Sequence, residues 1–374
     1  MSPEIASVPV QWPHNHQQDC VCAKFLQVGD MGWTAIWDTS GQVKGPQTHA
    51  SCAVSMPKSD HVTLILEGRL SRGGPRPVRL WAGIGDASGD FTLYRMPDGA
   101  MRISHRDVEM TTEPGTLSPG ETFLLHYRAD ANGRDALIDI QNIDRGLRLL
   151  LRPRVPSAPA LTDFLPKTPR YMEQLTLAAL ATHELPVGHA PCFETGTPIN
   201  TPSGPVRVED LRPGMVVNTL NNGPQPVRWT GQRELLCLGS MAPVLLRAPY
   251  FGLTQDCRVS PRHRILMDGT DVEYLFGEER VYIRAGDLVN GISARRDYTK
   301  PTRVFHHFLL DDHDCVTVGR CRMETLLLGD MLAADGRNTG QLSKADALPD
   351  YPTLDRAAAQ TLLSLIAEHR RVAA

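Results

Sequence analysis

Short apolar runs separated by tight-turn residues constrain the fold of the first half of this chain more than any other feature. The runs are rich in β-branched and aromatic residues and cover Val62–Glu67, Val78–Ile84, Phe91–Arg95, Met101–Ser104, Thr122–Tyr127 and Ala136–Ile140. Between them lie Gly73-Gly74, Asp86–Gly89, Pro97-Asp98-Gly99, Pro119-Gly120 and Asn132-Gly133, which favour hairpin turns. Short strands at this spacing predict an antiparallel β-sandwich over residues 31–151.

The length of the chain requires more than one hydrophobic core. At 374 residues it suits two domains, and its 31 glycines and 29 prolines favour short strands over long helices. A formal net charge of -3 gives no electrostatic basis for binding nucleic acid or an anionic membrane. The spacings of its eight cysteines match no small secreted disulfide framework, so we expect buried free thiols and one reactive thiol.

The first residues carry no targeting signal that the sequence reveals. Met1–Gln18 is polar and lacks the basic and apolar regions of a classical signal peptide, and no run approaches the length of a transmembrane helix. We expect a protein that is cytoplasmic or secreted by a non-classical route, with residues 1–30 forming an irregular arm. A His-x-His-x3-Cys-x-Cys pattern begins at His14, but its loose spacing near the chain end does not favour a zinc site.

Repeated prolines mark a linker at residues 152–191. They include Pro153, Pro156, Pro159, Pro166 and Pro169, which break regular structure. Within this segment Tyr171–Thr182 is predicted to form one short apolar helix, and from Leu185 the chain runs extended into Cys192. A proline-bounded segment before a candidate nucleophile suits a cleavage junction and an ordinary interdomain linker equally well.

Three sequence blocks organise the second half. The first is Cys192-Phe193-x-x-Gly196-Thr197-x-Ile199, followed by Val208-x-x-Leu211-x-x-Gly214-x-x-Val217. The second is Ser260-Pro261-Arg262-His263-Arg264, and the third runs from Val304 to Asp314 and on to Met323-Glu324-Thr325-Leu326. Three blocks in this order resemble the Hedgehog/intein (Hint) superfamily, and more narrowly its bacterial Hint-type family. The resemblance implies an all-β Hint fold over residues 192–340.

The resemblance also implies a reaction of the chain with itself. Cys192 would attack the peptide bond that joins it to Pro191, giving a thioester and a free amine. In the family, the second-block histidine hydrogen-bonds to the scissile nitrogen and protonates it, a role that falls to His263 here. Ser260 matches the hydroxyl residue that helps to hold the scissile peptide.

The third-block histidines admit several interpretations. His307 and His313 are candidates for tuning the thiol or activating a second nucleophile, whereas His306 stands where many inteins carry aspartate. A metal site formed by these histidines and Cys315 is an alternative. Histidines that merely alternate along a strand are the simplest interpretation, and we expect neither a metal nor another cofactor.

Two departures from splicing inteins shape the predicted reaction. Inteins that splice end in a His-Asn pair, and the chain passes Met323–Asp330 without one. We therefore expect N-terminal cleavage or acyl transfer to water, a thiol or an amine, with the chain's own N-terminal segment as substrate. The second departure is Pro191, whose carbonyl is shielded by the preceding acyl oxygen. This predicts slow or thiol-induced cleavage.

Two other functions stay open beside this single-turnover cysteine reaction. The N-terminal sandwich is similar to laminin-G-like or concanavalin-like jelly rolls, which often bind carbohydrate. The alternative function is therefore a sandwich that binds a glycan or surface ligand, followed by an inactive Hint fold that serves as a structural or interaction module. A weaker alternative is a thiol-dependent acyltransferase or protease that acts in trans.

The tail at residues 341–374 carries a predicted helix. Thr353 is a candidate N-cap, and Asp355 suits the first helical turn. Leu354, Ala358, Thr361, Leu362, Leu365 and Ile366 fall on one helical face. This apolar face predicts packing on the Hint domain rather than on a membrane.

Overall fold

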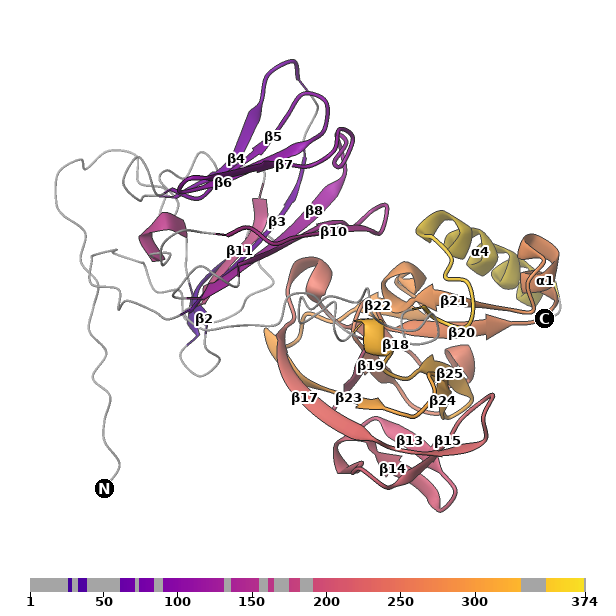
Figure 1. Ribbon diagram of the computed structural model, residues 1–374. Coiled ribbons are helices and arrows are strands. Elements are labelled where there is room, and N and C mark those ends of the chain that lie inside the picture. Colours follow the sequence, from indigo (N-terminus) through magenta and orange to yellow (C-terminus); the bar gives the residue numbers. More distant parts are fainter. Residues whose placement is uncertain are drawn as a thin grey trace, which may run out of the picture. The chain divides into compact units, whose positions relative to one another are not determined.

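The computed structural model describes two compact units (Figure 1). Residues 26–28, 33–38, 61–70, 74–83, 90–130, 136–154, 161–164, 175–181, 191–330 and 348–372 are described. The first unit comprises Met1–Ile143 and Leu147–Leu185, and the second comprises Asp144–Gly146 and Pro186–Ala374. The pattern that begins at His14 lies outside the described residues. The division after Leu185 falls within the predicted linker.

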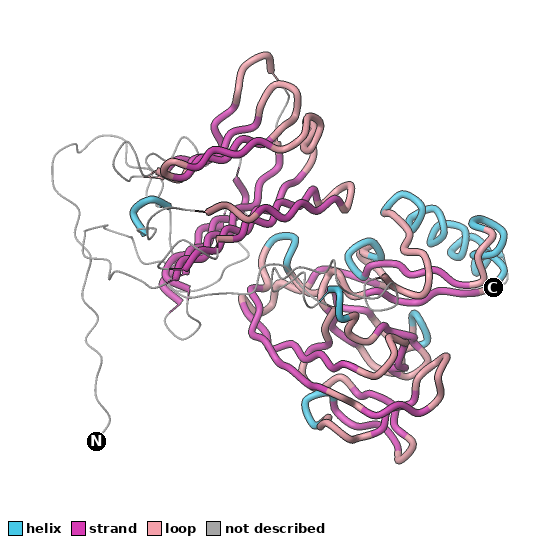
Figure 2. Tube along the Cα trace, in the orientation of Figure 1, coloured by secondary structure: helices cyan, strands magenta, loops and turns pink. Residues whose placement is uncertain are grey.

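The first unit is an antiparallel β-sandwich of two sheets (Figures 1 and 2). The larger sheet has the order β1-β2-β11-β3-β8-β9-β10, and the smaller has the order β4-β5-β6-β7. The strands are β1 (Leu26–Val28), β2 (Trp33–Asp38), β3 (His61–Arg69), β4 (Val78–Ala82), β5 (Thr92–Arg95), β6 (Met101–His105), β7 (Val108–Thr111), β8 (Thr122–Asp130), β9 (Leu137–Asn142), β10 (Leu147–Leu151) and β11 (Leu175–Ala181), with a 3₁₀ turn η1 (Leu161–Phe164).

The core of this unit fills the space between its two sheets. Leu66 and Phe123 come from the larger sheet, and Leu93 and Ile103 come from the smaller one. Strand β6 shows the cause, because its residues alternate between buried and half-buried and so line one face only. Each large apolar side chain buried in this way contributes about 1.5–3 kcal/mol. The predicted sandwich is therefore confirmed.

The helix predicted at Tyr171–Thr182 is wrong over Leu175–Ala181, which forms strand β11. This strand lies between β2 and β3 and pairs antiparallel with both. Its sequence, Leu-Thr-Leu-Ala-Ala-Leu-Ala, is almost wholly apolar, so its periodicity does not separate a buried strand from a buried helix. The segment thus belongs to the sandwich and not to a linker.

The second unit consists of short strands in two larger sheets and two hairpins. The sheet orders are β17-β23-β12-β19-β18-β22 and β21-β20-β25-β24, and the hairpins are β13-β14 and β15-β16. The elements are β12 (Phe193–Glu194), β13 (Pro198–Thr201), β14 (Gly204–Arg207), η3 (Val208–Asp210), β15 (Val216–Asn218), β16 (Pro224–Pro226), β17 (Trp229–Leu236), η4 (Gly239–Met241), β18 (Val244–Leu246), η5 (Tyr250–Gly252), β19 (Cys257–Val259), β20 (Arg264–Asp268), α1 (Thr270–Phe276), β21 (Arg280–Arg284), η6 (Ala285–Leu288), β22 (Ala294–Arg296), β23 (Thr302–Leu309), β24 (Cys315–Val318) and β25 (Cys321–Glu324).

The predicted C-terminal helix exists and packs on the second unit. Helix α4 (Arg356–Val372) carries Ala359 and Leu362, which join the core of that unit together with Leu354. The predicted N-cap is wrong, because the backbone N–H of Ala358 donates to the Asp355 carboxylate at 2.8 Å. Among the described residues, no helix is both long and apolar enough to cross a membrane.

Candidate functional site

Strand β12 lies at the centre of a sheet, and its neighbours carry the other two sequence blocks. Phe193 pairs with Val259 of β19 on one side and with His306 of β23 on the other. The three blocks, far apart in the sequence, therefore converge on the residue that precedes β12. That residue is Cys192, of which 2% is exposed.

Ser260 contacts both sides of Cys192. The backbone N–H of Cys192 donates to the Ser260 hydroxyl oxygen at 3.3 Å, and the backbone N–H of Ser260 donates to the Cys192 carbonyl at 3.1 Å. Burial raises the pKa of the Cys192 thiol to about 12, and the opposing effects of a hydrogen bond from the Ser260 side chain and of the Arg233 charge are smaller. The hydroxyl thus lies beside the thiol and beside the amide nitrogen of the Pro191–Cys192 bond.

The His263 ring lies against the other end of Cys192. Its Nδ1 is 3.2 Å from the Cys192 carbonyl oxygen. Since a carbonyl only accepts, Nδ1 carries the hydrogen and Nε2 is the basic nitrogen. Nε2 is buried, and no residue within the described ranges hydrogen-bonds to it. The sequence predicted that His263 contacts the scissile nitrogen, whereas the structure places the Ser260 hydroxyl there.

Burial keeps the His263 imidazole neutral. It lowers the pKa of His263 to about 4, while Glu324 and the hydrogen bond to the Cys192 carbonyl act in the opposite direction. The side chain is fully buried, with the Phe193 ring packed edge-on against it at 4.5 Å between centroids. At neutral pH this histidine is therefore a proton acceptor with one nitrogen still available.

A tight turn explains the three-residue spacing between Ser260 and His263. The backbone N–H of His263 donates to the Ser260 carbonyl at 3.1 Å, which closes the turn. The N–H groups of Ala285 and Gly286 donate to the His263 and Pro261 carbonyls, each at 2.8 Å, and anchor the turn to η6. Both side chains are thus carried to Cys192 by one short, fixed segment.

His307 lies next to the nucleophile by strand register. Phe193 is opposite His306 and Glu194 is opposite Phe305, so the same register places Cys192 opposite His307. Phe305, on the same face of β23, shares an apolar cluster with Cys192. The structure therefore brings His307 to the site.

Trp229 fixes the orientation of the His307 ring. The two rings stack with centroids 5.3 Å apart. Gly231, the partner of His307 across the sheet, allows this stack: a Cβ there would lie 2.2 Å from the Trp229 ring and 2.8 Å from Nε2 of His307. His306, by contrast, bonds through Nε2 to the Thr195 hydroxyl at 2.8 Å.

His313 lies in a separate ionic cluster. Its ring nitrogens are 3.5 Å from Glu324 and 3.6 Å from Asp350. Burial alone would lower the pKa of His313, but these two carboxylates raise it to about 9. His313 is therefore a charged partner of Glu324.

Glu324 is a site residue to which the sequence assigned no role. Its carboxylate is fully buried and accepts from the backbone N–H and the Nε of Arg264, both at 2.6 Å. Arg264 follows His263 directly, and the Glu324 charge raises the pKa of that histidine. A carboxylate between Met323 and the apolar run Leu326-Leu327-Leu328 is the signal that points to it.

The other thiols among the described residues do not form a second site. Cys237 shares the apolar cluster around Cys192, and Cys257, Cys315 and Cys321 are also free and buried. Over the residues that the structure describes, no group of three histidine, cysteine or acidic side chains is arranged to hold a metal ion. The alternative metal site at the third-block histidines therefore has no support in the described residues.

Comparisons with known proteins match this geometry to a family. The family model of the Hint domain matches residues 191–330. An intein-like domain from Clostridium thermocellum is 17% identical over 36% of this chain and 97% of its own, with a TM-score of 0.27. The MchDnaB-1 intein is 14% identical over 35% and 98%, with a TM-score of 0.25.

A further solved structure is also similar to part of the chain. The CBM40 of the Ruminococcus gnavus IT-sialidase, bound to α2,3-sialyllactose, is 11% identical over 34% of this chain and 78% of its own, with a TM-score of 0.24. No curated protein matches. The family match and the convergence of the three blocks on Cys192 identify residues 191–330 as a Hint domain, of the self-processing Hedgehog/intein superfamily.

Proposed function

We propose that the Hint domain cleaves its own chain at the Pro191–Cys192 bond. The sulfur of Cys192 attacks the Pro191 carbonyl carbon, a C–S bond forms, and the C–N bond of the peptide breaks. The proton that leaves the sulfur ends on the freed nitrogen of Cys192. The product is a Pro191 thioester, which water, a thiol or an amine then opens to separate residues 1–191 from residues 192–374.

The position of the Ser260 hydroxyl carries this proposal. It lies beside the thiol that must lose a proton and 3.3 Å from the nitrogen that must gain one. A hydroxyl both donates and accepts, so it relays a proton from Sγ to the nitrogen without a free thiolate.

His263 orients the reacting residue and is itself neutral. Its Nδ1–H holds the Cys192 carbonyl, which fixes the residue whose nitrogen and sulfur react. His307, which the strand register places opposite Cys192, is the third-block histidine that we assign to the site.

We expect the reaction at the resting site to be slow. A thiol pKa of about 12 leaves about one thiolate in 10⁵ at pH 7, so deprotonation must accompany attack. The shielded prolyl carbonyl adds to the barrier. We therefore infer slow cleavage that added thiols accelerate, and transfer without splicing because no His-Asn pair closes the domain.

Intact mass spectrometry of the purified chain tests the proposal. The wild type is compared with Cys192→Ala, with and without dithiothreitol or hydroxylamine. We expect fragments 1–191 and 192–374 from the wild type only. Cys321→Ala is the matched control, because Cys321 is equally buried but belongs to a different apolar cluster from Cys192, and it should cleave at the wild-type rate.

Two outcomes would favour the other functions. A single full-length mass under every condition would leave the Hint domain as a structural or interaction module. A rate that rises with protein concentration would indicate a reaction in trans. A rate independent of concentration, together with loss of cleavage in Cys192→Ala, supports self-cleavage.

A further inference from the structure

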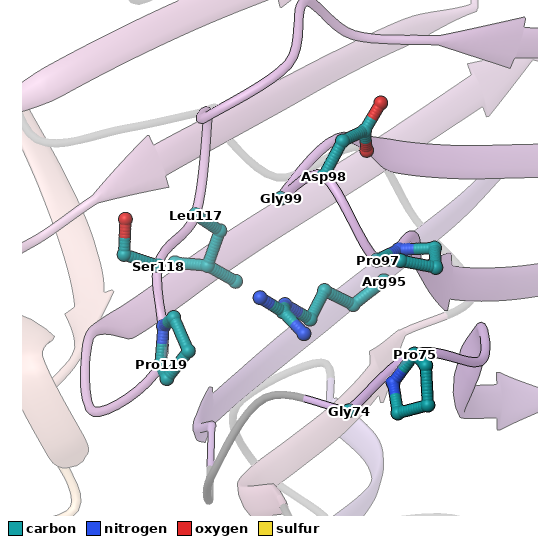
Figure 3. Close-up of a pocket in the computed structure, with 9 residues that line it drawn as sticks. All are labelled: Gly74, Pro75, Arg95, Pro97, Asp98, Gly99, Leu117, Ser118 and Pro119. Carbon is teal, nitrogen blue, oxygen red and sulfur yellow. The ribbon is translucent and has the colours of Figure 1, made fainter.

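A cavity of about 510 Å³ lies in the first unit, at the turn between β5 and β6 (Figure 3). It is widely open to solvent, and its lining is polar and apolar in equal parts; the apolar part includes Pro75, Pro97, Leu117 and Pro119. This volume lies within the usual range for small-molecule sites. The cavity belongs to the sandwich and contains none of the residues of the Hint site.

Arg95 points into this cavity (Figure 3). It is the last residue of β5, where burial alternates, so it shares the inward face of the strand with Leu93. Only 5% of Arg95 is exposed. Figure 3 shows its guanidinium between the Leu117–Pro119 wall and Pro75. The alternation of the strand thus directs a cation to the inner side of a sheet.

The guanidinium has no counter-ion among the described residues. Its Nε is buried and without a hydrogen-bond partner there. Asp98 also lines the cavity, but its carboxylate accepts from the Ala100 N–H at 3.0 Å and points away from Arg95 (Figure 3). A buried charge without a partner is costly, because desolvation is not offset by a hydrogen-bonded ion.

We propose that this cavity binds the carboxylate of a small organic acid through Arg95. The planar guanidinium matches a carboxylate in two parallel hydrogen bonds. Proline and leucine walls suit the hydrocarbon part of such a ligand. One cation balances one negative charge, and the nearby Asp98 disfavours a dianion such as phosphate. This function is independent of the self-cleavage proposed for the second unit.

Binding to the full chain tests the site. Propionate and D-glucuronate represent a simple acid and an acidic sugar, and their affinities are measured by ligand-observed NMR at constant ionic strength. Propionamide and D-glucose are the neutral controls, and inorganic phosphate is the dianion control. We expect saturable binding of at least one carboxylate, about tenfold or more tighter than its neutral control. The better carboxylate identifies the source of the ligand.

Arg95→Met is the decisive variant, and Arg79→Met is its matched control. Arg79 lies on the paired strand β4, is exposed, and bonds to the Tyr94 hydroxyl instead of entering the cavity. We expect Arg95→Met to weaken carboxylate binding about tenfold or more and Arg79→Met to leave it unchanged. Because a methionine removes a buried unpaired charge, Arg95→Met should unfold at the wild-type temperature or above it without ligand.

Three results would overturn the proposal. They are wild-type affinity in Arg95→Met, equal binding of the neutral controls, and phosphate binding that exceeds carboxylate binding. If Arg95→Met failed to fold, the NMR resonance of the Arg95 Nε–H group in the wild type would test the site instead. Propionate or glucuronate must then shift this resonance in a saturable way. An unshifted resonance counts against the site.

Discussion

The Ser260 hydroxyl oxygen lies 3.3 Å from the amide nitrogen of Cys192, while the Ser260 amide holds the Cys192 carbonyl at 3.1 Å. One residue of the second block thus contacts the first block from both sides. The relation depends on β12 lying beside β19, so that a turn that leaves β19 passes directly over Cys192. The fold brings together the groups that the proposed shift requires.

Removing the Ser260 hydroxyl tests its role as a proton relay. We expect Ser260→Ala to slow formation of fragments 1–191 and 192–374 about 100-fold, because general acid–base groups typically contribute factors of that order. The rate is measured by intact mass at a fixed dithiothreitol concentration. Ser260→Thr keeps a hydroxyl and should retain more activity than the alanine variant; equal rates for the two variants would refute the relay.

Replacing Pro191 tests the origin of slow cleavage. Donation from the preceding acyl oxygen shields a prolyl carbonyl, and Pro191→Gly relieves it. We expect cleavage to accelerate about tenfold, on the order of the 1.4 kcal/mol that a tenfold rate represents. The double variant that carries Pro191→Gly and Cys192→Ala is the control for ordinary proteolysis next to residue 191, and it must remain uncleaved. An unchanged rate in Pro191→Gly would place the barrier at the buried thiol instead.

Much of the fold is visible in the sequence, because an exposed sheet face leaves an alternating pattern. Strand β6 alternates Met101, Ile103 and His105 inward with polar residues outward, and was predicted closely. The segment Leu175–Ala181 gave no alternation, because β11 lies between two other strands and is buried almost throughout. Pairing with β2 on one side and β3 on the other makes this segment a strand, and that pairing depends on the tertiary fold.

The candidate site was partly visible for a similar reason. Cys192, Ser260 and His263 stand in blocks whose spacing reflects a local turn and two strands, and the structure brings them together. Glu324 acts through Arg264, which lies 60 residues away in sequence, and no local pattern reveals such a pair. His313 has the expected residue type, but the partners of its ring nitrogens are two carboxylates, Glu324 and Asp350.

The stability of the Hint domain should fall between neutral and alkaline pH because of His313. Glu324 and Asp350 raise its pKa to about 9 against the burial that lowers it, from an ordinary value of 6.5. The folded state therefore holds a proton that the unfolded state loses first, so this stabilisation is complete below pH 6.5 and is lost as pH rises through about 9. Its size is about 3 kcal/mol.

Urea unfolding at several pH values measures this effect. The free energy of unfolding of the wild type should decline across that range, and His313→Gln should remove the part of the decline that lies below about pH 8, before thiols ionise in the unfolded state. His369→Gln is the control, since His369 forms an exposed ion pair with Asp271, of a kind that contributes little. A pH profile that is the same in His313→Gln and the wild type would contradict the assignment.

Two nearby side chains, Thr353 and Asp355, are candidates for the N-cap of α4. The Asp355 carboxylate accepts from the Ala358 N–H at 2.8 Å, whereas the buried Thr353 hydroxyl has no hydrogen-bond partner among the described residues. Loss of a cap costs about 1 kcal/mol, while replacing an unsatisfied hydroxyl by a methyl group costs nothing and relieves a desolvation penalty. Asp355→Ala should therefore lower the free energy of unfolding of the Hint domain by about 1 kcal/mol, and Thr353→Val should leave it unchanged or raise it. Urea titration of both variants decides, because a loss in Thr353→Val larger than that in Asp355→Ala would restore Thr353 as the residue on which the helix depends.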